Sequence, residues 1–524
     1  MAAGASSVIM AACGGAVPIP SPAATVATST SSGTTPSTQP RPGGTIRTGI
    51  LGDLPGLDGH LQLQTNSQSI AFAYDTLVGY DEQLTPLPML AESWDVSSDL
   101  KTLKLNLRKG VQYHDGREFT SDDVKWNLLR VRDPKLAGVA GFFANQSNWF
   151  TGIEAPDKNT VVLTSDQPRV GVFDFLFAFN MLDKNTMEGP DAKTTVNGTG
   201  PFVFQEWVQG DHVGLTKNKN YWRSGVPYLD GMHVGIFKDS QSMMASLEAG
   251  AIDVADAPPI PDIVRLKSNP SYQTIVTTSA GTYYVIIANV QVAPTGNKLF
   301  RQGINYAINR KRFADAVLQG LAGAPQDLPY PPQAPAYDAP RNGRYTFDLD
   351  KARSLVAQSG VSNTDLEIVF SNTSFGIENT QMTQILASDL ATIGVNLTLR
   401  PVDFATQFDT AVKRTYAGLL MSAGSNANLA DSTTPLISNK FWNPDVSQNF
   451  TGLDDPEYTR LVAAAASEPD AARRKELYGQ IEDIILDQSA VMVLSLFPRA
   501  AMARSNVQAL TLVPRASYPT VWMA

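Results

Sequence analysis

Cysteine is almost absent from this chain, which holds a single one, Cys13, among 524 residues. One cysteine excludes an internal disulfide framework. A thiolate nucleophile also needs a base placed beside it by a fold, whereas Cys13 stands in a leader of small residues, Ile-Met-Ala-Ala-Cys-Gly-Gly. We therefore expect no cysteine chemistry within the folded part of the protein.

Histidine and catalytic motifs are also scarce. The four histidines are dispersed, without a His-x-x-x-His or His/Cys pair, so no metal site is expected. No Gly-x-Ser-x-Gly elbow, Walker A loop or dinucleotide fingerprint occurs. The paired carboxylates Asp122-Asp123 and Asp454-Asp455 fall at predicted helix starts, where capping explains them better than acid–base catalysis. The sequence therefore predicts a protein that is not an enzyme and needs no cofactor.

Positive charge and long apolar runs are missing as well. Lys and Arg number 41 against 50 Asp and Glu, which gives a net charge of −9. A nucleic-acid partner is not expected, because neutralising phosphates needs basic surface. No apolar run reaches the roughly 18 residues of a membrane span. A chain of 524 residues is too long for one ordinary core and should divide into two or three lobes.

The first 43 residues predict an anchor followed by a tether. Met10–Cys13 resembles the lipobox of bacterial lipoproteins, which implies that Cys13 is lipidated and that residues 1–13 are the remnant of a signal. The alternative is a chance cysteine in an unfolded leader. Met1–Ala12 is short and lacks Lys and Arg, so we expect the true start to lie upstream. Residues 14–43 are almost wholly Ala, Pro, Ser, Thr and Gly, a composition typical of a flexible tether.

From Gly44 onwards, strand and helix patterns alternate, which predicts a mixed α/β fold. The predicted strands are 45–50, 101–108, 159–164, 202–207, 283–288, 366–370, 396–401 and 491–496. The predicted helices are 69–78, 121–131, 240–249, 298–317, 348–358, 381–393, 456–466 and 471–487. Segments 366–370, 381–393 and 396–401 should form a β-α-β unit.

Several spaced blocks are similar to those of a known family. Leu90–Val124, which contains Ala-Glu-Ser-Trp-Asp and Tyr-His-Asp-Gly-Arg-Glu-Phe, resembles the hallmark stretch of the family 5 extracellular solute-binding proteins. These are the oligopeptide-, dipeptide- and nickel-binding proteins of ABC importers. Further blocks follow in the family's order: Asn197–Phe202 with Lys219–Trp222, Ser246–Asp253, Arg301–Arg310 with Gly320, and Asp348–Arg353. The resemblance covers the chain from about Gly44 to its end.

The resemblance implies a periplasmic-binding-protein fold of type II, with three lobes and a hinged ligand cleft. By analogy, residues 44–77, 197–282 and 490–524 make lobe I, residues 78–196 lobe II and residues 283–489 lobe III. The ligand should bind between lobes I and III and be buried by hinge closure. The implied protein is a monomer, anchored by its lipid outside the cytoplasm, that delivers a small ligand to ABC permease subunits. A ligand-sensing receptor on the same scaffold and a secreted hydrolase are the alternatives.

Candidate ligand-binding residues lie in segments that should face the gap between lobes I and III. They are Leu57, Asp58, Tyr74, Tyr283, Asn426, Asn428, Asp431 and Trp442. Peptide binders of the family usually place an acid after a lobe III strand, and that acid holds the ammonium of the peptide. Here either Asp431 reaches the ammonium through a longer loop, or a polar uncharged or amphipathic ligand is held by Asn426, Asn428 and stacking on Trp442. We favour the second possibility and keep a peptide as the family default.

Overall fold

The computed structural model describes residues 39–60, 68–81, 84–136, 143–190, 192–278, 282–323, 325–373, 376–425, 431–438, 440–512 and 518–524. Cys13 and nearly all of the predicted tether lie outside these ranges. Within the described part of the chain, no helix is long and apolar enough to cross a membrane. Pro40–Ala524 form one compact unit.

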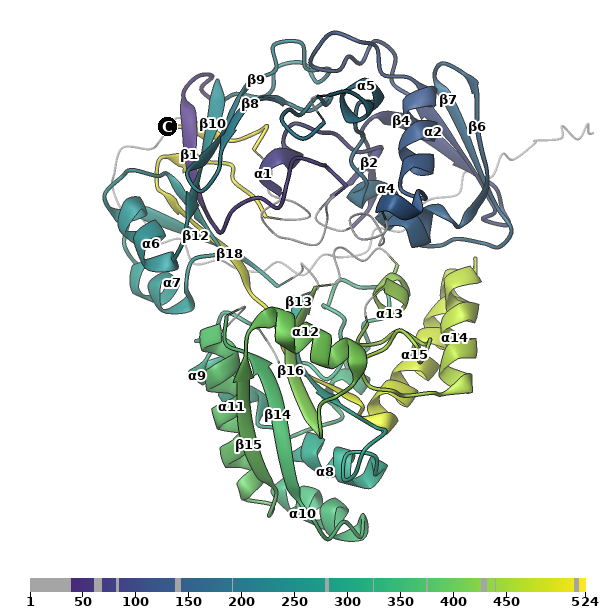
Figure 1. Cartoon of the computed structure of the whole chain (residues 1–524), viewed down its shortest axis with the longest axis vertical. Coiled ribbons are helices and arrows are strands. Elements are labelled where there is room, and N and C mark those ends of the chain that lie inside the picture. The colour runs from purple at the N-terminus through teal and green to yellow at the C-terminus, as the bar shows by residue number, and fades with distance from the viewer. Residues whose placement is uncertain are drawn as a thin grey trace, which may run out of the picture. The chain divides into compact units, whose positions relative to one another are not determined.

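Strands and helices alternate along the described chain, as expected (Figure 1). The strands are β1 Thr45–Leu51, β2 Val78–Tyr80, β3 Pro86–Pro88, β4 Ala91–Val96, β5 Thr102–Leu107, β6 Phe150–Asp157, β7 Thr160–Ser165, β8 Phe202–Val208, β9 His212–Lys217, β10 Gly231–Phe237, β11 Val254–Asp256, β12 Tyr272–Thr277, β13 Thr282–Ala288, β14 Asp365–Ser371, β15 Asn396–Val402, β16 Leu419–Ser425, β17 Val491–Leu496, β18 Arg499–Arg504, β19 Val507–Gln508 and β20 Trp522–Met523. The helices are α1 Gln68–Ala71, α2 Ser121–Arg130, α4 Val172–Ala178, α5 Lys184–Glu188, α6 Ser240–Glu248, α7 Ile260–Leu266, α8 Lys298–Ala307, α9 Arg310–Ala316, α10 Leu349–Gln358, α11 Gly376–Ala391, α12 Phe404–Lys413, α13 Thr434–Ser438, α14 Pro456–Ser467 and α15 Ala471–Gln488.

The first large sheet has seven strands in the order β12-β18-β11-β1-β10-β9-β8. Strand β1, which comes first in the sequence, lies near the middle of this sheet and runs parallel to both of its neighbours, β10 and β11. An ion pair ties β1 to the turn that precedes β11, because the Arg47 guanidinium meets the buried Asp253 carboxylate at 2.7 Å. Helix α6 packs against β1, β10 and β11.

A smaller sheet of four strands, β4-β5-β7-β6, is antiparallel throughout. Strand β5 alternates buried leucines with polar residues, as its period of two predicts. Helix α2 packs against β6 and β7. The prediction that this helix starts after Thr120 is confirmed, because the Thr120 N–H donates to the Asp123 carboxylate at 2.9 Å.

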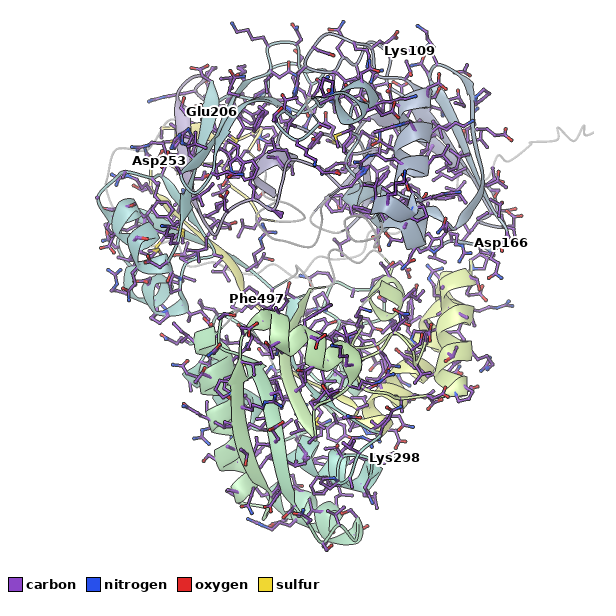
Figure 2. The ribbon with its side chains drawn as sticks, in the orientation of Figure 1. Lys109, Asp166, Glu206, Asp253, Lys298 and Phe497 are labelled. Carbon is purple, nitrogen blue, oxygen red and sulfur yellow. The ribbon has the colours of Figure 1, made fainter. Side chains whose placement is uncertain are left out.

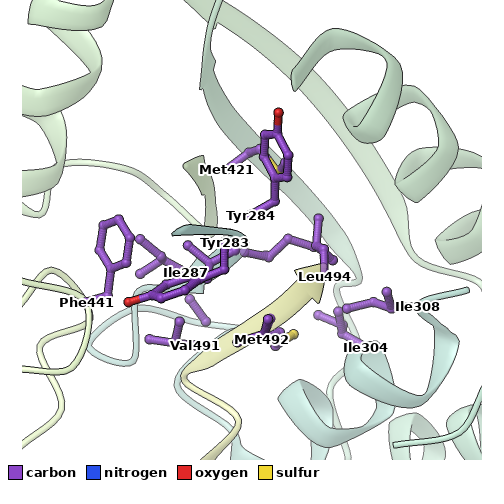
Figure 3. Close-up of a cluster of buried hydrophobic side chains, with 14 of the residues drawn as sticks. Tyr283, Tyr284, Ile287, Ile304, Ile308, Met421, Phe441, Val491, Met492 and Leu494 are labelled. Carbon is purple, nitrogen blue, oxygen red and sulfur yellow. The ribbon is translucent and has the colours of Figure 1, made fainter. Parts of the chain in front are cut away.

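The third sheet has five strands in the order β15-β14-β16-β13-β17. The predicted β-α-β unit is present, with β14 parallel to β15 and helix α11 packed on both. Strand β13 lies between β16 and β17, and its residues from Tyr283 to Ala288 are fully buried, which is typical of an uninterrupted apolar strand. Figure 3 shows the alternation along β13, with Tyr283 directed toward Phe441 and Tyr284 toward Met421.

The chain passes between the seven- and five-stranded sheets twice, from β12 to β13 and from β17 to β18. The two passages lie side by side, because the Phe497 N–H donates to the Thr282 carbonyl at 2.8 Å. Figure 2 labels Phe497 at this passage. The sequence placed residues 490–524 with lobe I, but β17 pairs with β13 inside the five-stranded sheet. We propose three lobes built on the three sheets, with lobe III extended to Leu496.

Two predicted helices differ from the structure. The helix predicted at 298–317 is broken into α8 and α9, because Ile308 is extended and the Asn309 side chain caps the new helix by accepting from the Arg312 N–H at 3.0 Å. The helix predicted at 69–78 is described only as α1 and ends at Ala71. Its expected last turn is not helical, because Thr76 forms a β-bridge with Asn180 and strand β2 begins at Val78.

Candidate ligand-binding site

The carboxyl ends of three neighbouring strands share one edge of the five-stranded sheet. Strands β15 and β16 both run parallel to β14, so their carboxyl ends point to the same edge; β14 and β15 end together at Ser371 and Val402, and β16 continues to Ser425. Strand β13 begins at the same edge, since its residue Thr282 pairs with Ser425. The passage from the seven-stranded sheet therefore arrives at the carboxyl edge of the five-stranded sheet.

The seven-stranded sheet has the same arrangement. Strands β1 and β10 end together at Leu51 and Phe237, and β11 is parallel to them. Strand β18 starts at this edge with Arg499, which pairs with Thr277 at the end of β12. Both passages thus join one carboxyl edge to the other. Ligands of open α/β sheets bind outside the carboxyl ends of the strands, so these two edges form the candidate site.

On the five-stranded side, this edge exposes apolar side chains. Ile377 and Phe404 are 66% and 52% exposed, the highest values among the large apolar residues of the described chain. Ile377 lies in the first turn of α11 and Phe404 in the first turn of α12, the helices that follow β14 and β15. The Phe404 N–H donates to the Thr373 hydroxyl at 3.2 Å, which holds the start of α12 beside the end of β14. Exposed apolar groups gathered at one place are typical of a binding surface.

On the seven-stranded side, the edge carries an acid and a base. Asp256 ends β11, and Arg499 starts the neighbouring strand β18. Burial raises the pKa of the Asp256 carboxyl, while the positive charge of Arg499 acts in the opposite direction. Ala257, which follows, has a left-handed backbone with φ of 51°, an unusual conformation for alanine that is often found at functional sites. The edge therefore offers a half-buried cation next to a carboxyl group.

The predicted residue Asp58 lies in the loop after β1, where it binds helix α2. The Arg130 guanidinium donates to both Asp58 oxygens, at 2.7 and 3.2 Å, and to His60 Nδ1 at 2.8 Å. Burial by itself would raise the pKa of Asp58, but the hydrogen bonds and charge of Arg130 prevail, and that pKa is lowered. Burial, with the Arg130 charge, lowers the pKa of His60 to about 3, so the imidazole is neutral at physiological pH. The triad of Asp58, Arg130 and His60 ties lobe I to lobe II.

Leu57 and Tyr74 pack close to Asp58. Both are buried in the apolar cluster under the seven-stranded sheet. The Tyr74 hydroxyl approaches the Leu57 carbonyl at 3.5 Å, and a Cβ on Gly59 would lie 2.7 Å from the Tyr74 ring. The structure therefore brings Leu57, Asp58 and Tyr74 together.

Tyr283 and Trp442 form a second group, inside lobe III. Trp442 Nε1 donates to the Tyr283 hydroxyl at 2.9 Å, and the Tyr458 hydroxyl donates to the Trp442 carbonyl at 2.7 Å. All three side chains are buried. Trp442 also lines a cavity of about 30 Å³, which has room for a water molecule or two but not for a solute.

Asp431 lies apart from both groups, at the contact between lobes II and III. It is 3% exposed. Its carboxylate accepts from the Tyr478 hydroxyl at 3.0 Å and from the Thr433 N–H at 3.1 Å. Asn426 and Asn428 lie outside the described residues.

Sequence reasoning missed four residues of the two carboxyl edges. They are Ile377 and Phe404 on one side and Asp256 and Arg499 on the other. One signal was present for Phe404, because it follows the last strand of the predicted β-α-β unit directly. Asp256 and Arg499 carried no local signal, since strands β11 and β18 meet only through pairing between distant segments.

Comparison with known proteins shows the family. A sequence profile of the bacterial extracellular solute-binding proteins, family 5 middle, matches residues 85–444. Heme-binding protein A of Haemophilus influenzae is 27% identical over 447 residues, which cover 79% of this chain and 80% of that protein. The glutathione-binding protein GsiB of Escherichia coli K12 is 28% identical over 480 residues, 87% of this chain and 90% of that protein.

A solved structure agrees with this assignment. The PBP AgaA of A. tumefaciens R10, in complex with agropinic acid, superposes with a TM-score of 0.78 at 25% sequence identity. The match covers 92% of this chain and 99% of that one. The expected periplasmic-binding-protein fold is thereby confirmed. The chain belongs to family 5 of the bacterial extracellular solute-binding proteins, and it binds a small solute outside the cytoplasm for an ABC importer.

Proposed function

We propose that the chain captures an amphipathic carboxylic acid between the carboxyl edges of the two sheets and presents it to ABC permease subunits. One observation carries the proposal: exposed apolar Ile377 and Phe404 lie at one edge, and the half-buried cation of Arg499 lies at the other. An apolar portion of the ligand would pack on Phe404, and its carboxylate would pair with Arg499.

The ligands in the names of the matched proteins suit this chemistry. Heme, glutathione and agropinic acid all carry carboxylates. A peptide with a free C-terminus fits the same description and stays within the proposal. An uncharged ligand, which the sequence favoured together with an amphipathic one, would not use the positive charge of Arg499.

Closure about the paired passages would bury the ligand. Phe497 and Thr282 join the passages by a hydrogen bond, so they act as one two-stranded hinge. Binding without catalysis suits the candidate residues, because the His60 imidazole and the Asp58 carboxylate are already held by Arg130. The protein would work as a monomer, tethered to the outer face of a membrane through Cys13.

Two measurements test the ligand class. Native mass spectrometry of protein purified without refolding should reveal a retained acid, which calorimetry then compares with its methyl ester or amide. The acid should bind at least tenfold more tightly, because its carboxylate can form a charge-assisted pair with the Arg499 guanidinium that the neutral ester or amide cannot form. Arg499→Gln should remove that preference for the acid. Phe404→Ala should lower the affinity for the acid and for its ester or amide by the same factor. Lys298→Gln, on the remote helix α8, is the control. Equal binding of acid and ester, unchanged in Arg499→Gln, contradicts the proposal.

A further inference from the structure

A hydrogen-bonded contact joins lobe II to lobe III away from the two passages. Asp174, on helix α4, accepts from the Asp431 N–H at 3.0 Å and from the Thr434 hydroxyl at 3.4 Å through the same oxygen, Oδ2. The three residues are 5%, 3% and 7% exposed, so the contact is shielded from bulk solvent. A further cross-lobe hydrogen bond runs from the Val170 N–H to the Ala466 carbonyl at 3.4 Å.

Each carboxylate of this contact is also held from its own lobe. The Tyr80 hydroxyl donates to Asp174 Oδ1 at 2.7 Å, and the Tyr478 hydroxyl donates to Asp431 Oδ1 at 3.0 Å. The Thr434 hydroxyl lies 3.1 Å from Asp431 Oδ2 as well, so its one hydrogen is shared between the two carboxylates. Buried carboxylates are tolerated when hydrogen bonds satisfy their oxygens. The two hydrogen bonds to Asp174 Oδ2, from the Asp431 N–H and the Thr434 hydroxyl, both come from lobe III. They exist only while lobes II and III are in contact.

The contact is also sterically close. A Cβ on Gly171, at the start of α4, would lie 2.6 Å from the Thr434 hydroxyl and 2.8 Å from Asp431 Oδ2. A side chain at this position would therefore force the two lobes apart or break the network. In Figure 1, α13 lies on the side of the five-stranded sheet that faces α4.

We infer that Asp174, Asp431 and Thr434 form a latch that holds lobes II and III together when the hinge closes. The inference rests on the proposed hinge closure. Hydrogen bonds that exist only in the closed state stabilise that state, so a few of them shift the balance between open and closed states. The latch also assigns a role to Asp431, whose carboxylate orients Thr434 and holds the chain that donates to Asp174. This role is distinct from binding a ligand's ammonium group.

The latch is tested on unliganded protein by measuring the distance between the lobes. Cysteines placed at Glu154 on β6 and Glu476 on α15, in a Cys13→Ser background, carry spin labels for double electron–electron resonance. The starting protein should give one dominant short distance. Thr434→Val keeps the shape of the side chain and removes its hydroxyl, so the fraction of separated lobes should rise about fivefold or more. Asp174→Asn should have the same effect.

Two matched controls make the result specific. Thr295→Val removes a buried hydroxyl that bonds to the Asn289 carbonyl within lobe III, and it should leave the distances unchanged. Gly171→Ala adds a methyl group to the contact without removing a polar group, and it should separate the lobes. Gly343→Ala, where a Cβ meets no atom within 4 Å, should not.

Thermal unfolding identifies any variant that fails to fold, and Gly171→Ala then tests the latch by itself. Distances in Thr434→Val, Asp174→Asn and Gly171→Ala that match those of their controls overturn the latch. The measurement needs no ligand, so its failure leaves the proposed carboxylate site standing. Conversely, unchanged affinity in Arg499→Gln leaves the latch standing.

Discussion

The Arg130 guanidinium donates hydrogen bonds to both carboxylate oxygens of Asp58, at 2.7 and 3.2 Å, across the junction of lobes I and II. Both side chains are largely buried. Asp58→Asn leaves the Arg130 charge without its partner, so the free energy of unfolding at pH 7 should fall by about 3 kcal/mol. Urea titration measures this loss.

The loss in Asp58→Asn should depend on pH. The folded-state pKa of Asp58 is below its ordinary value of 3.8. The pair therefore stabilises fully above about pH 4, and its contribution is lost as the pH falls through the lowered pKa. Asp166→Asn breaks the exposed pair with Arg169 and should cost less than about 1 kcal/mol. A loss in Asp58→Asn that is equal at pH 7 and pH 3 goes against this account.

Glu482 on α15 should make the stability of the protein fall as the pH rises from mildly acidic to mildly alkaline values. Its side chain is fully buried, and neither carboxyl oxygen has a hydrogen-bond partner among the described residues. Burial raises the pKa of Glu482 from 4.5 to about 8. The folded protein thus keeps a proton that the unfolded chain releases, so the free energy of unfolding falls as the pH rises from about 4.5 to 8.

Glu482→Gln removes this titration, so its free energy of unfolding should change less with pH than that of the parent protein. The difference should be roughly 3–5 kcal/mol between about pH 4.5 and 8, at about 1.4 kcal/mol per pKa unit. Glu476→Gln, an exposed change on the same helix, is the control. Denaturant unfolding at several pH values between 4 and 9 compares the slopes. Parallel profiles for the parent protein and Glu482→Gln would show that the folded-state pKa of Glu482 is not raised.

Tyr283 should contribute to the stability of the folded protein and should not contact the ligand. Tyr283→Phe leaves the buried Trp442 Nε1–H without its acceptor, which costs about 1–3 kcal/mol. Ligand affinity should stay within about twofold of the parent value. Tyr272→Phe, on the half-buried strand β12, is the matched change. A large loss of affinity with unchanged stability would place Tyr283 in the ligand site.

The contrast between Trp442 and the β-α-β unit shows how far sequence reasoning reaches. Strands β14 and β15 and helix α11 were predictable because their periodic apolar residues lie close together in the chain. Trp442 stands in a loop, where an aromatic residue suggests ligand stacking, yet its partner Tyr283 is 159 residues away. Likewise Asp431 meets Asp174 across 257 residues. Local patterns predict elements, but contacts between distant segments decide which polar side chains remain available.

The predicted anchor is testable without the fold. A protein expressed from an extended start should fractionate with membranes, because the lipid on Cys13 would hold it there. Cys13→Ala should release most of it into the soluble fraction. Equal recovery of the two forms in the membrane fraction removes the anchor from the account.

Hydrogen exchange with and without the co-purified ligand tests the location of the site most directly. If the ligand binds between the carboxyl edges, it should slow exchange at the ends of β1 and β14, at the start of α12 and around Phe497. Amides at the opposite edges, such as those near Gly231 and Asn396, should exchange equally in both states. Protection confined to the Trp442 cavity, or to one sheet alone, would contradict a ligand bound between the two edges.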